Sequence, residues 1–429
     1  MKKFILLSIF ILIYCNGFTQ DVLTTEGIVK KTFTDVKTIC DKDNGALWGK
    51  NIWGPILYID RETRAIIANQ QDSAGILKKV ENLYFGTFPS DNIVANSTTN
   101  IWGTFWATVS MLPEDDFTRN SLFIHEAFHR LQPELGVTNK GYENNHLDNI
   151  TARILMKLEW SALKTSIIKS DSIDCHSILD ALIFRNYRRS LFPGSDSMEN
   201  RFEIHEGLAE YTSNKLCSSS VKELEGHLLA KHEDYWNKES LVRSFGYYSG
   251  FFYAFLLDCA KINWRGSVTS STDLGMLLRD SLNLIMPHNL QKAYDSIKTN
   301  YDYSAIKDSE ELIRKTKEAL ISKYTDSFLK NPVLKIGLIY PHFGFNVNSL
   351  QPLDSCGVVY ETIVIIDEWG TLNVSSEGCL ISNDWSYALV PATYIKVKEN
   401  KIQSKSWELI LNDHWEMIQK ESNYYLKLK

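Results

Sequence analysis

Two histidines and a glutamate within five residues have the types and the spacing to bind and use a metal ion. They are His125, Glu126 and His129, in the pattern HExxH. Histidines four residues apart lie one above the other on a helix, so both imidazoles can reach a single ion. Glu126 is rotated by about 100° from His125, which sets its carboxylate beside the ion without making it a ligand. The pattern predicts hydrolysis by a zinc-activated water, with Glu126 as the general base.

The residues around this motif favour the helix that it requires. The segment PEDD at 113–116 supplies a proline and a run of acids where a helix would begin, and Asp115 or Asp116 can cap it. Residues 117–131 contain neither Gly nor Pro, and Pro133 ends the run. The segment is apolar enough to be largely buried. Charged side chains in a buried helix are costly unless something compensates them, and a bound cation would do so.

A third protein ligand is expected, because a catalytic zinc usually has three. An EGxAxY string at 206–211, in a segment that favours helix, follows the HExxH motif along the chain. Together the two motifs resemble the gluzincin metallopeptidases, the clan that includes the thermolysin-like enzymes and a group of aminopeptidases. The resemblance implies that Glu206 is the third zinc ligand. Glu210 matches the acid that hydrogen-bonds a zinc-bound histidine in the thermolysin-like enzymes, one helical turn further on.

The chain departs from the pattern of this clan in three ways. His205 stands where the clan has Asn. The gap from His129 to Glu206 is 77 residues, where roughly twenty are typical. The GxMEN signature of the aminopeptidases is absent, so nothing marks a site for a free amino terminus.

Other acidic and histidine side chains stay open as ligands. Glu159 is the alternative third ligand. It lies on an apolar helix, where a buried carboxylate needs a partner. That partner could also be Arg153 or a neighbouring helix. His146 and Asp148 could bind a metal ion as well, but both are expected to be structural residues or to lie at the rim of the site.

An acyl-transfer site also needs a donor for the oxyanion that develops during the reaction. By resemblance to the Tyr-x-x-Gly pattern of the aminopeptidases, Tyr247 takes this role, and the alternative is that the whole aromatic stretch 245–253 is core. The segment 102–109, just before the HExxH helix, favours a strand. The resemblance implies an antiparallel edge strand here, which would pair with an extended peptide substrate.

The first twenty residues have the features of a signal peptide. Two lysines are followed by eleven apolar residues at 4–14, a stretch too short to span a membrane. Cys15 is a weaker candidate for lipid attachment, because Tyr14 precedes it where a small residue is preferred. The mature chain is expected to be exported, periplasmic or secreted, with no membrane-spanning segment. Of its six cysteines, Cys356 and Cys379 are the expected disulfide pair.

The remaining chain favours an α+β fold in three parts. Residues 21–110 are expected to form an N-terminal region of short strands and turns that contributes the cleft edge strand, with strands at 55–59 and 65–68. Residues 111–328 are expected to form a largely helical zincin catalytic domain. Residues 333–429 favour an all-β barrel or sandwich, with a hairpin turn at 367–370.

Charge and motifs together define the expected function. The net charge of −6 argues against nucleic acid as a partner. The expectation is an exported metallopeptidase that acts on peptides or proteins with one zinc ion per chain. Two alternatives stay open, namely an inactive surface-binding or scaffold protein of the same fold, and a zinc-dependent amidase for non-peptide substrates.

Overall fold

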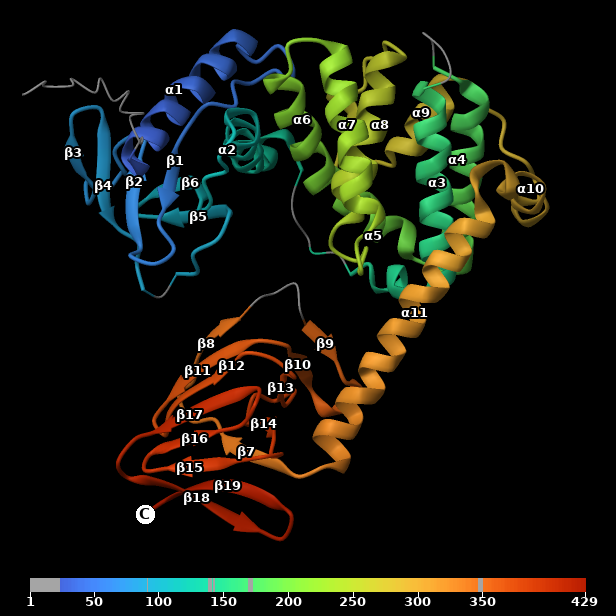
Figure 1. The fold of residues 1–429 in the computed structure, drawn as a ribbon. Coiled ribbons are helices and arrows are strands. Elements are labelled where there is room, and N and C mark those ends of the chain that lie inside the picture. The colour runs from blue at the N-terminus through green and yellow to red at the C-terminus, as the bar shows by residue number, and fades with distance from the viewer. Residues whose placement is uncertain (1–23, 91, 138–140, 142, 169–172, 346–349) are drawn as a thin grey trace, which may run out of the picture. The chain divides into compact units, whose positions relative to one another are not determined.

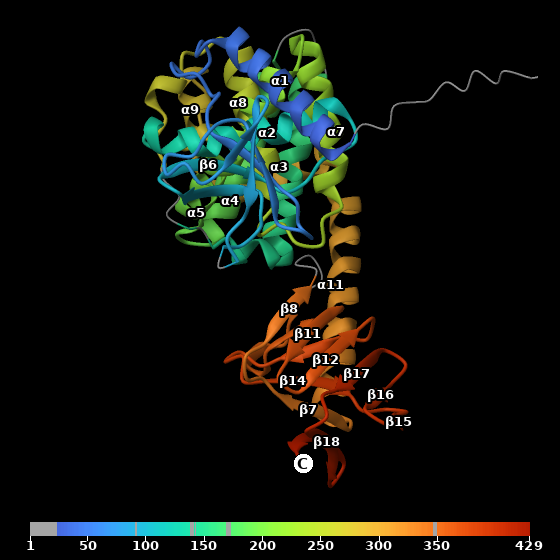
Figure 2. The same ribbon diagram turned by 90° about the vertical axis from the view of Figure 1, so that its left-hand side faces the viewer.

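The computed structural model describes residues 24–429 except 91, 138–140, 142, 169–172 and 346–349. The expected signal peptide and Cys15 therefore lie outside the described residues. The chain forms two compact units, residues 1–306 and 307–429, and each is described by itself (Figure 1, Figure 2). Helices and sheets are both present, so the broad α+β class expected from the sequence is confirmed.

The first unit begins with a helix and a six-stranded sheet. The sheet order is β3-β4-β2-β1-β6-β5. Strands β1 and β6 are parallel, and the other neighbouring pairs are antiparallel. The strands expected at 55–59 and 65–68 are β1 and β2. The elements are α1 (Thr25–Asp43), β1 (Ile56–Ile59), β2 (Ala65–Ala68), β3 (Lys78–Val80), β4 (Leu83–Thr87), β5 (Ser97–Ile101) and β6 (Thr104–Val109).

Helix α1 was not expected from the sequence. Its buried residues include Val29, Phe33, Val36 and Cys40, a spacing of three and four residues that marks one face of a helix. This face shares a core with the sheet and with the HExxH helix. The sequence of this segment therefore contains the apolar spacing of a helix, although the region around it favours strands and turns.

The rest of the first unit is helical, as expected. Its α-helices are α2 (Asp116–Leu131), α3 (Ile150–Ile168), α4 (Cys175–Leu191), α5 (Ser195–Phe202), α6 (Leu208–Cys217), α7 (Val221–Trp236), α8 (Phe245–Cys259), α9 (Leu274–Ser281) and α10 (Leu290–Ile297). Between α5 and α6 the chain makes a π-helical turn, η3 (Glu203–Gly207). Such turns are rare and often occur at functional sites.

The expected edge strand at 102–109 is wrong in one respect. Its strand, β6, lies inside the sheet between β1 and β5, and the edge strand is β5. Trp102 and Gly103 both have positive φ (51° and 74°), the geometry of a tight hairpin turn that folds β5 back along β6. Trp106 is fully buried on the sheet face away from α2, so its side chain is part of the core and does not line the site.

The second unit contains most of one long helix and two β-sheets that share a core. One sheet has the order β18-β19-β7-β14-β13-β10-β9, and the other has the order β15-β16-β17-β12-β11-β8. Within the described residues neither sheet closes, so a barrel is excluded. Asp367 and Gly370 pair across the expected hairpin turn. The elements are α11 (Tyr303–Thr325), which begins before residue 307, β7 (Val333–Gly337), β8 (His342–Phe345), β9 (Leu350–Pro352), β10 (Val358–Tyr360), β11 (Ile363–Asp367), β12 (Gly370–Val374), β13 (Cys379–Ile381), β14 (Tyr387–Pro391), β15 (Lys396–Lys398), β16 (Lys401–Gln403), β17 (Trp407–Leu411), β18 (Trp415–Lys420) and β19 (Asn423–Leu428).

The expected disulfide between Cys356 and Cys379 is wrong. Both thiols are free. Cys379 belongs to the core between the two sheets, whereas Cys356 packs against a second cluster that contains Leu380. Neighbouring residues of a strand point to opposite faces, so Cys379 faces away from the cluster that Cys356 contacts.

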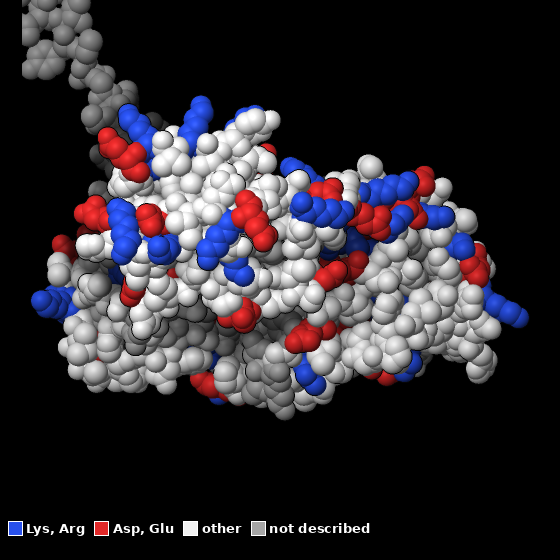
Figure 3. All heavy atoms as spheres, turned by 90° about the horizontal axis from the view of Figure 1, so that it is seen from below, with Lys and Arg blue, Asp and Glu red and all other residues white. Residues whose placement is uncertain are grey.

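Two observations bear on the partners of this protein. No helix within the described part of the chain is long and apolar enough to span a membrane. On the face shown in Figure 3, basic and acidic side chains are interspersed. This mixture differs from the single-sign basic stripe that marks many nucleic-acid-binding proteins.

Candidate metal centre

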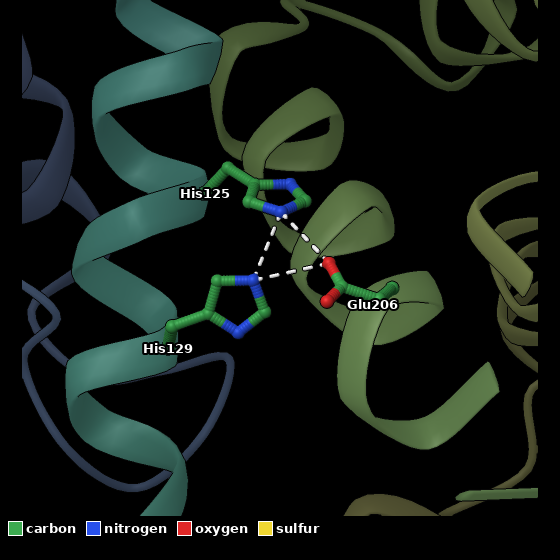
Figure 4. Close-up of side chains that lie close together, drawn as sticks. All are labelled: His125, His129 and Glu206. Carbon is green, nitrogen blue, oxygen red and sulfur yellow. Dashed lines mark hydrogen bonds and ion pairs between the residues drawn. The ribbon is translucent and has the colours of Figure 1, made fainter. Parts of the chain in front are cut away.

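Helix α2 carries the two histidines of the motif. Its first turn is capped by Asp115, whose carboxylate accepts a hydrogen bond from the Thr118 N–H (2.8 Å). His125 and His129 project from the same face of the helix (Figure 4), and their Nε2 atoms lie 3.0 Å apart. Both side chains are about nine-tenths buried (9% and 10% exposed). The helix therefore brings two imidazole nitrogens together away from bulk water.

Glu206 approaches these histidines from a different helical segment. Its Oε2 atom lies 3.5 Å from Nε2 of His125 and 3.3 Å from Nε2 of His129. Three ligand atoms around a tetrahedral ion, with bonds of about 2.0–2.1 Å, are roughly 3.3 Å apart. The observed triangle has sides close to this spacing. The buried group of His125, His129 and Glu206 could therefore hold a metal ion.

The turn that carries Glu206 is fixed by a close approach of helix α8. A Cβ atom added to Gly207 would lie 2.5 Å from the Gly246 carbonyl oxygen and 2.6 Å from the Gly250 Cα atom. A Cβ atom added to Gly250 would lie 2.6 Å from the Glu203 carbonyl oxygen. Only glycines allow the two backbones to pack this closely. The packing of this turn therefore requires a glycine after Glu206, because Gly207 determines how near the π turn lies to α8.

Gln132 joins the two halves of the site. Its Nε2 atom donates to the carbonyl oxygens of Ile204 (3.2 Å) and His205 (2.7 Å), both in the π turn. Its Oε1 atom, 2.8 Å from Nδ1 of His129, must then accept a hydrogen bond from that ring. With the proton on Nδ1, the Nε2 lone pair of His129 points toward Glu206. Gln132 therefore both holds the turn and selects the tautomer.

Glu210 orients the other histidine. Its Oε2 atom lies 3.2 Å from Nδ1 of His125, which leaves Nε2 facing the other ligands. Its Oε1 atom lies 2.5 Å from Nζ of Lys231. The contact expected between Glu210 and a histidine is present. Carboxylates in this position fix the ring and raise its basicity toward a metal ion.

The electrostatics of the site favour a cation. Glu126, Glu206 and Glu210 are three carboxylates near one ammonium, Lys231, which leaves two excess negative charges in a largely buried region. Burial would raise the pKa of Glu206, but its contacts with the three histidines 125, 129 and 205 outweigh burial and hold the pKa far below its usual range. Burial opposes protonation of His125, yet its bonds to Glu206 and Glu210 raise its pKa to about 10. Without a metal ion, a proton therefore takes the place of the positive charge.

Glu126 is suited to exchange protons. Its side chain is buried (residue 5% exposed), and within the described part of the chain it has no hydrogen bond or ion pair. Burial raises its pKa, the neighbouring imidazoles of His125 and His129 lower it, and the carboxylates Glu206 and Glu210 raise it again, with a net shift upward. A carboxylate that is neither paired nor a ligand, and whose pKa is raised toward neutrality, has the properties of a general base.

Of the two adjacent tyrosines in α8, Tyr247 lies beside the metal group. Its ring stacks on the ring of His125 with centroids 5.9 Å apart and an interplanar angle of 15°. Tyr248 is fully buried, and its hydroxyl lies 3.0 Å from Nδ1 of His232. Tyr235 of α7 stacks on Tyr247 from the other helix, with centroids 6.4 Å apart. The geometry thus associates Tyr247, and not Tyr248, with the site.

The alternative ligand Glu159 is committed elsewhere. Its Oε1 atom accepts hydrogen bonds from Arg185 (3.1 Å) and Tyr253 (2.8 Å), and its Oε2 atom accepts one from Arg188 (2.6 Å). Its partners are thus arginines of a neighbouring helix, α4, together with a tyrosine of α8. Both oxygens of this fully buried carboxylate are satisfied. Glu159 therefore serves a structural ion network and is not part of the metal group.

The other sequence candidates are also structural. His146 lies 2.8 Å from Glu199, a fully buried carboxylate that also pairs with Arg188. Asp148 accepts a hydrogen bond from Ser240 (3.1 Å). The tyrosine of the EGxAxY string, Tyr211, is fully buried and hydrogen-bonds to Asp258. None of these three belongs to the metal group.

The sheet edge nearest to α2 is formed by β5. In the pairing of β5 with β6, Asn100 lies opposite Phe105 and Thr98 lies opposite Ala107. Ala107 belongs to the core shared with α2, so these four residues lie on the sheet face toward that helix. Phe105 is 39% exposed despite this orientation. Among the described residues no strand pairs with the outer side of β5, so this edge presents main-chain groups without a strand partner, next to an exposed aromatic ring.

Two residues at the site were missed by sequence reasoning. Gln132 follows the HExxH motif by three residues, on the same helical face as His129, and this spacing could have indicated it. In the sequence His205 is only a departure from the clan pattern, yet its ring stacks on His129 with centroids 4.5 Å apart.

Comparison of the chain with family models, curated proteins and solved structures finds no match. The resemblance to gluzincins stays a prediction from two short motifs.

Proposed function

We propose that this protein is a zinc-dependent metallopeptidase of gluzincin type, with Glu126 as its general base. The observation that carries the proposal is the combination of a three-ligand group at tetrahedral spacing with an unpaired buried carboxylate one residue from a ligand. Two imidazoles and one carboxylate form a ligand set that is common in catalytic zinc sites of hydrolases. The proposal includes export of the chain, which rests on the sequence of residues 1–20 alone.

The chain's own residues would divide the chemistry among them. A zinc ion supplies Lewis acidity and makes a water molecule acidic near neutral pH. Glu126 accepts the proton of the attacking water on its carboxylate and delivers it to the leaving nitrogen. The raised pKa of Glu126 suits this exchange, because a proton can then be both taken and returned. Glu210 and Gln132 keep the histidine Nδ1 protons in place during the reaction.

Two further groups would act on the substrate. Tyr247 is proposed as the donor to the oxyanion, because it lies beside His125 and is partly exposed. The free edge of β5 is proposed to pair with an extended peptide, which would gain main-chain hydrogen bonds without requiring a particular sequence. Phe105, exposed on the same face of the sheet, would contact a substrate side chain.

The test is the digestion of a mixed peptide library, read by mass spectrometry. The wild-type protein is expected to cleave peptides, and a chelator is expected to stop it. Glu126→Gln is expected to lower the rate by about 10²–10⁴-fold while zinc stays bound. Glu134→Gln is a matched control, because Glu134 is half exposed and pairs with Lys50 (2.7 Å) outside the site. Unchanged cleavage by Glu126→Gln would refute the mechanism, and zinc binding without any cleavage would favour a binding protein.

A further inference from the structure

His205 contacts both sides of the metal group. Its ring stacks on His129 with centroids 4.5 Å apart and an interplanar angle of 25°. Its Nδ1 atom lies 3.0 Å from Oε1 of Glu206. Its side chain is 17% exposed. It is thus held against one ligand by its ring and against another by a hydrogen bond.

The direction of this hydrogen bond follows from the two groups. An ionised carboxylate can only accept, so the Nδ1 atom of His205 must carry the proton. The other oxygen of Glu206, Oε2, faces the Nε2 atoms of His125 and His129 at 3.5 and 3.3 Å. The two oxygens of this carboxylate therefore have different partners, one a hydrogen-bond donor and the other the metal group.

We propose that His205 is a positioning residue that keeps Glu206 a one-oxygen ligand. This inference rests on the proposed metal site and goes beyond it. A carboxylate without such a donor can turn and offer both oxygens to an ion, which fills a further coordination position. With Oε1 held by His205, only Oε2 is available, and a position stays free for water. Donors behind a ligand commonly change metal affinity by about 10–100-fold.

Two variants separate the hydrogen bond from the stacking. His205→Phe keeps a ring against His129 and removes the donor. His205→Asn removes the ring but places a side-chain N–H close to the position of Nδ1, because both atoms are two bonds from Cβ. His205→Phe is therefore expected to disturb the site, and His205→Asn is expected to restore it.

The measurement is the binding of Co²⁺ and Zn²⁺ to the full chain, without any peptide. For His205→Phe we expect weaker Zn²⁺ binding by about tenfold or more in competition with a chelator. We also expect the visible absorption of the Co²⁺ form to weaken, because absorption falls when coordination rises above four. His205→Asn should stay within about threefold of the wild-type affinity and keep its spectrum.

Several outcomes would overturn the inference. If His205→Phe equals the wild type in affinity and spectrum, or if His205→Asn is as impaired as His205→Phe, the hydrogen bond does not position Glu206. Both results leave the proposed function standing, because the wild type still binds metal. If the wild type binds neither ion, the proposed function and this inference both fail.

A second measurement covers the case in which His205→Phe does not fold. In the wild-type Zn²⁺ form labelled with ¹⁵N-histidine, we expect one slowly exchanging Nδ1–H signal, besides those of His125 and His129, that is missing in His205→Asn. Absence of that signal from the wild type would overturn the inference, since Nδ1 would not be the donor.

Discussion

Substitution of Gly207 by alanine tests whether the packing of helix α8 determines the position of Glu206. The new Cβ atom would lie 2.5 Å from the Gly246 carbonyl oxygen and 2.6 Å from the Gly250 Cα atom. Both are backbone atoms, so neither can rotate away as a flexible side chain would. The π turn and α8 must separate instead, and Glu206 moves with the turn.

The size of the effect follows from these distances. An ordinary contact needs about 3.4 Å, so the backbones must separate by about 0.9 Å. Overpacking of this kind costs about 1–3 kcal/mol of stability. A displacement of this size would change the 3.3 and 3.5 Å spacings of Glu206 from the histidines by about a quarter. We expect Zn²⁺ affinity to fall by about 10–100-fold.

The assay combines thermal unfolding with competition for Zn²⁺ against a chelator. Gly226→Ala is the matched control, because Gly226 lies in helix α7 with no atom within 4 Å of a built Cβ. That change is expected to leave metal affinity unchanged and to stabilise the helix by up to about 1 kcal/mol. A folded Gly207→Ala variant with wild-type affinity would refute the reasoning, since the turn would not depend on this contact.

The remaining predictions also concern the site. Glu206→Ala should remove most of the bound zinc by metal analysis, whereas Glu159→Ala should destabilise the fold by about 1–3 kcal/mol, because it removes the buried acceptor that Arg185, Arg188 and Tyr253 share, and should retain zinc while folded. Zinc binding at pH 8 should release about one proton from His125, whose pKa is raised to about 10, measured by calorimetry in buffers of different protonation enthalpy. The same shift gives the metal-free protein stability that is present below pH 6.5 and lost as pH rises toward 10, and equal stability at both pH values would contradict it. Tyr247→Phe should lower kcat by about 10²–10³-fold with zinc content unchanged, and loss of zinc instead would assign Tyr247 a structural role.

The local elements of the site could be predicted from the sequence. The helix at 116–131 follows from a cap, an apolar run and a proline, all within one segment. Contact between Glu210 and His125 follows from helical spacing on two segments, once the motif resemblance joins them. Short-range patterns of this kind determine which side chains share a face.

Longer-range features could not be predicted in this way. The π turn depends on helix α8, which lies some forty residues further along the chain, and no local pattern at 203–207 indicates it. The role of Glu159 depends on Arg185 and Arg188 of another helix. Sheet order decided that β5, and not β6, is the edge strand. These features depend on tertiary packing, which a single sequence does not display.

The most direct test of the account is a crystal structure of the zinc-loaded protein with anomalous diffraction recorded on both sides of the zinc absorption edge. We predict one zinc peak per chain, bound by Nε2 of His125, Nε2 of His129 and one oxygen of Glu206. A zinc ion bound elsewhere, or none at this group in protein saturated with zinc, would contradict the central claim.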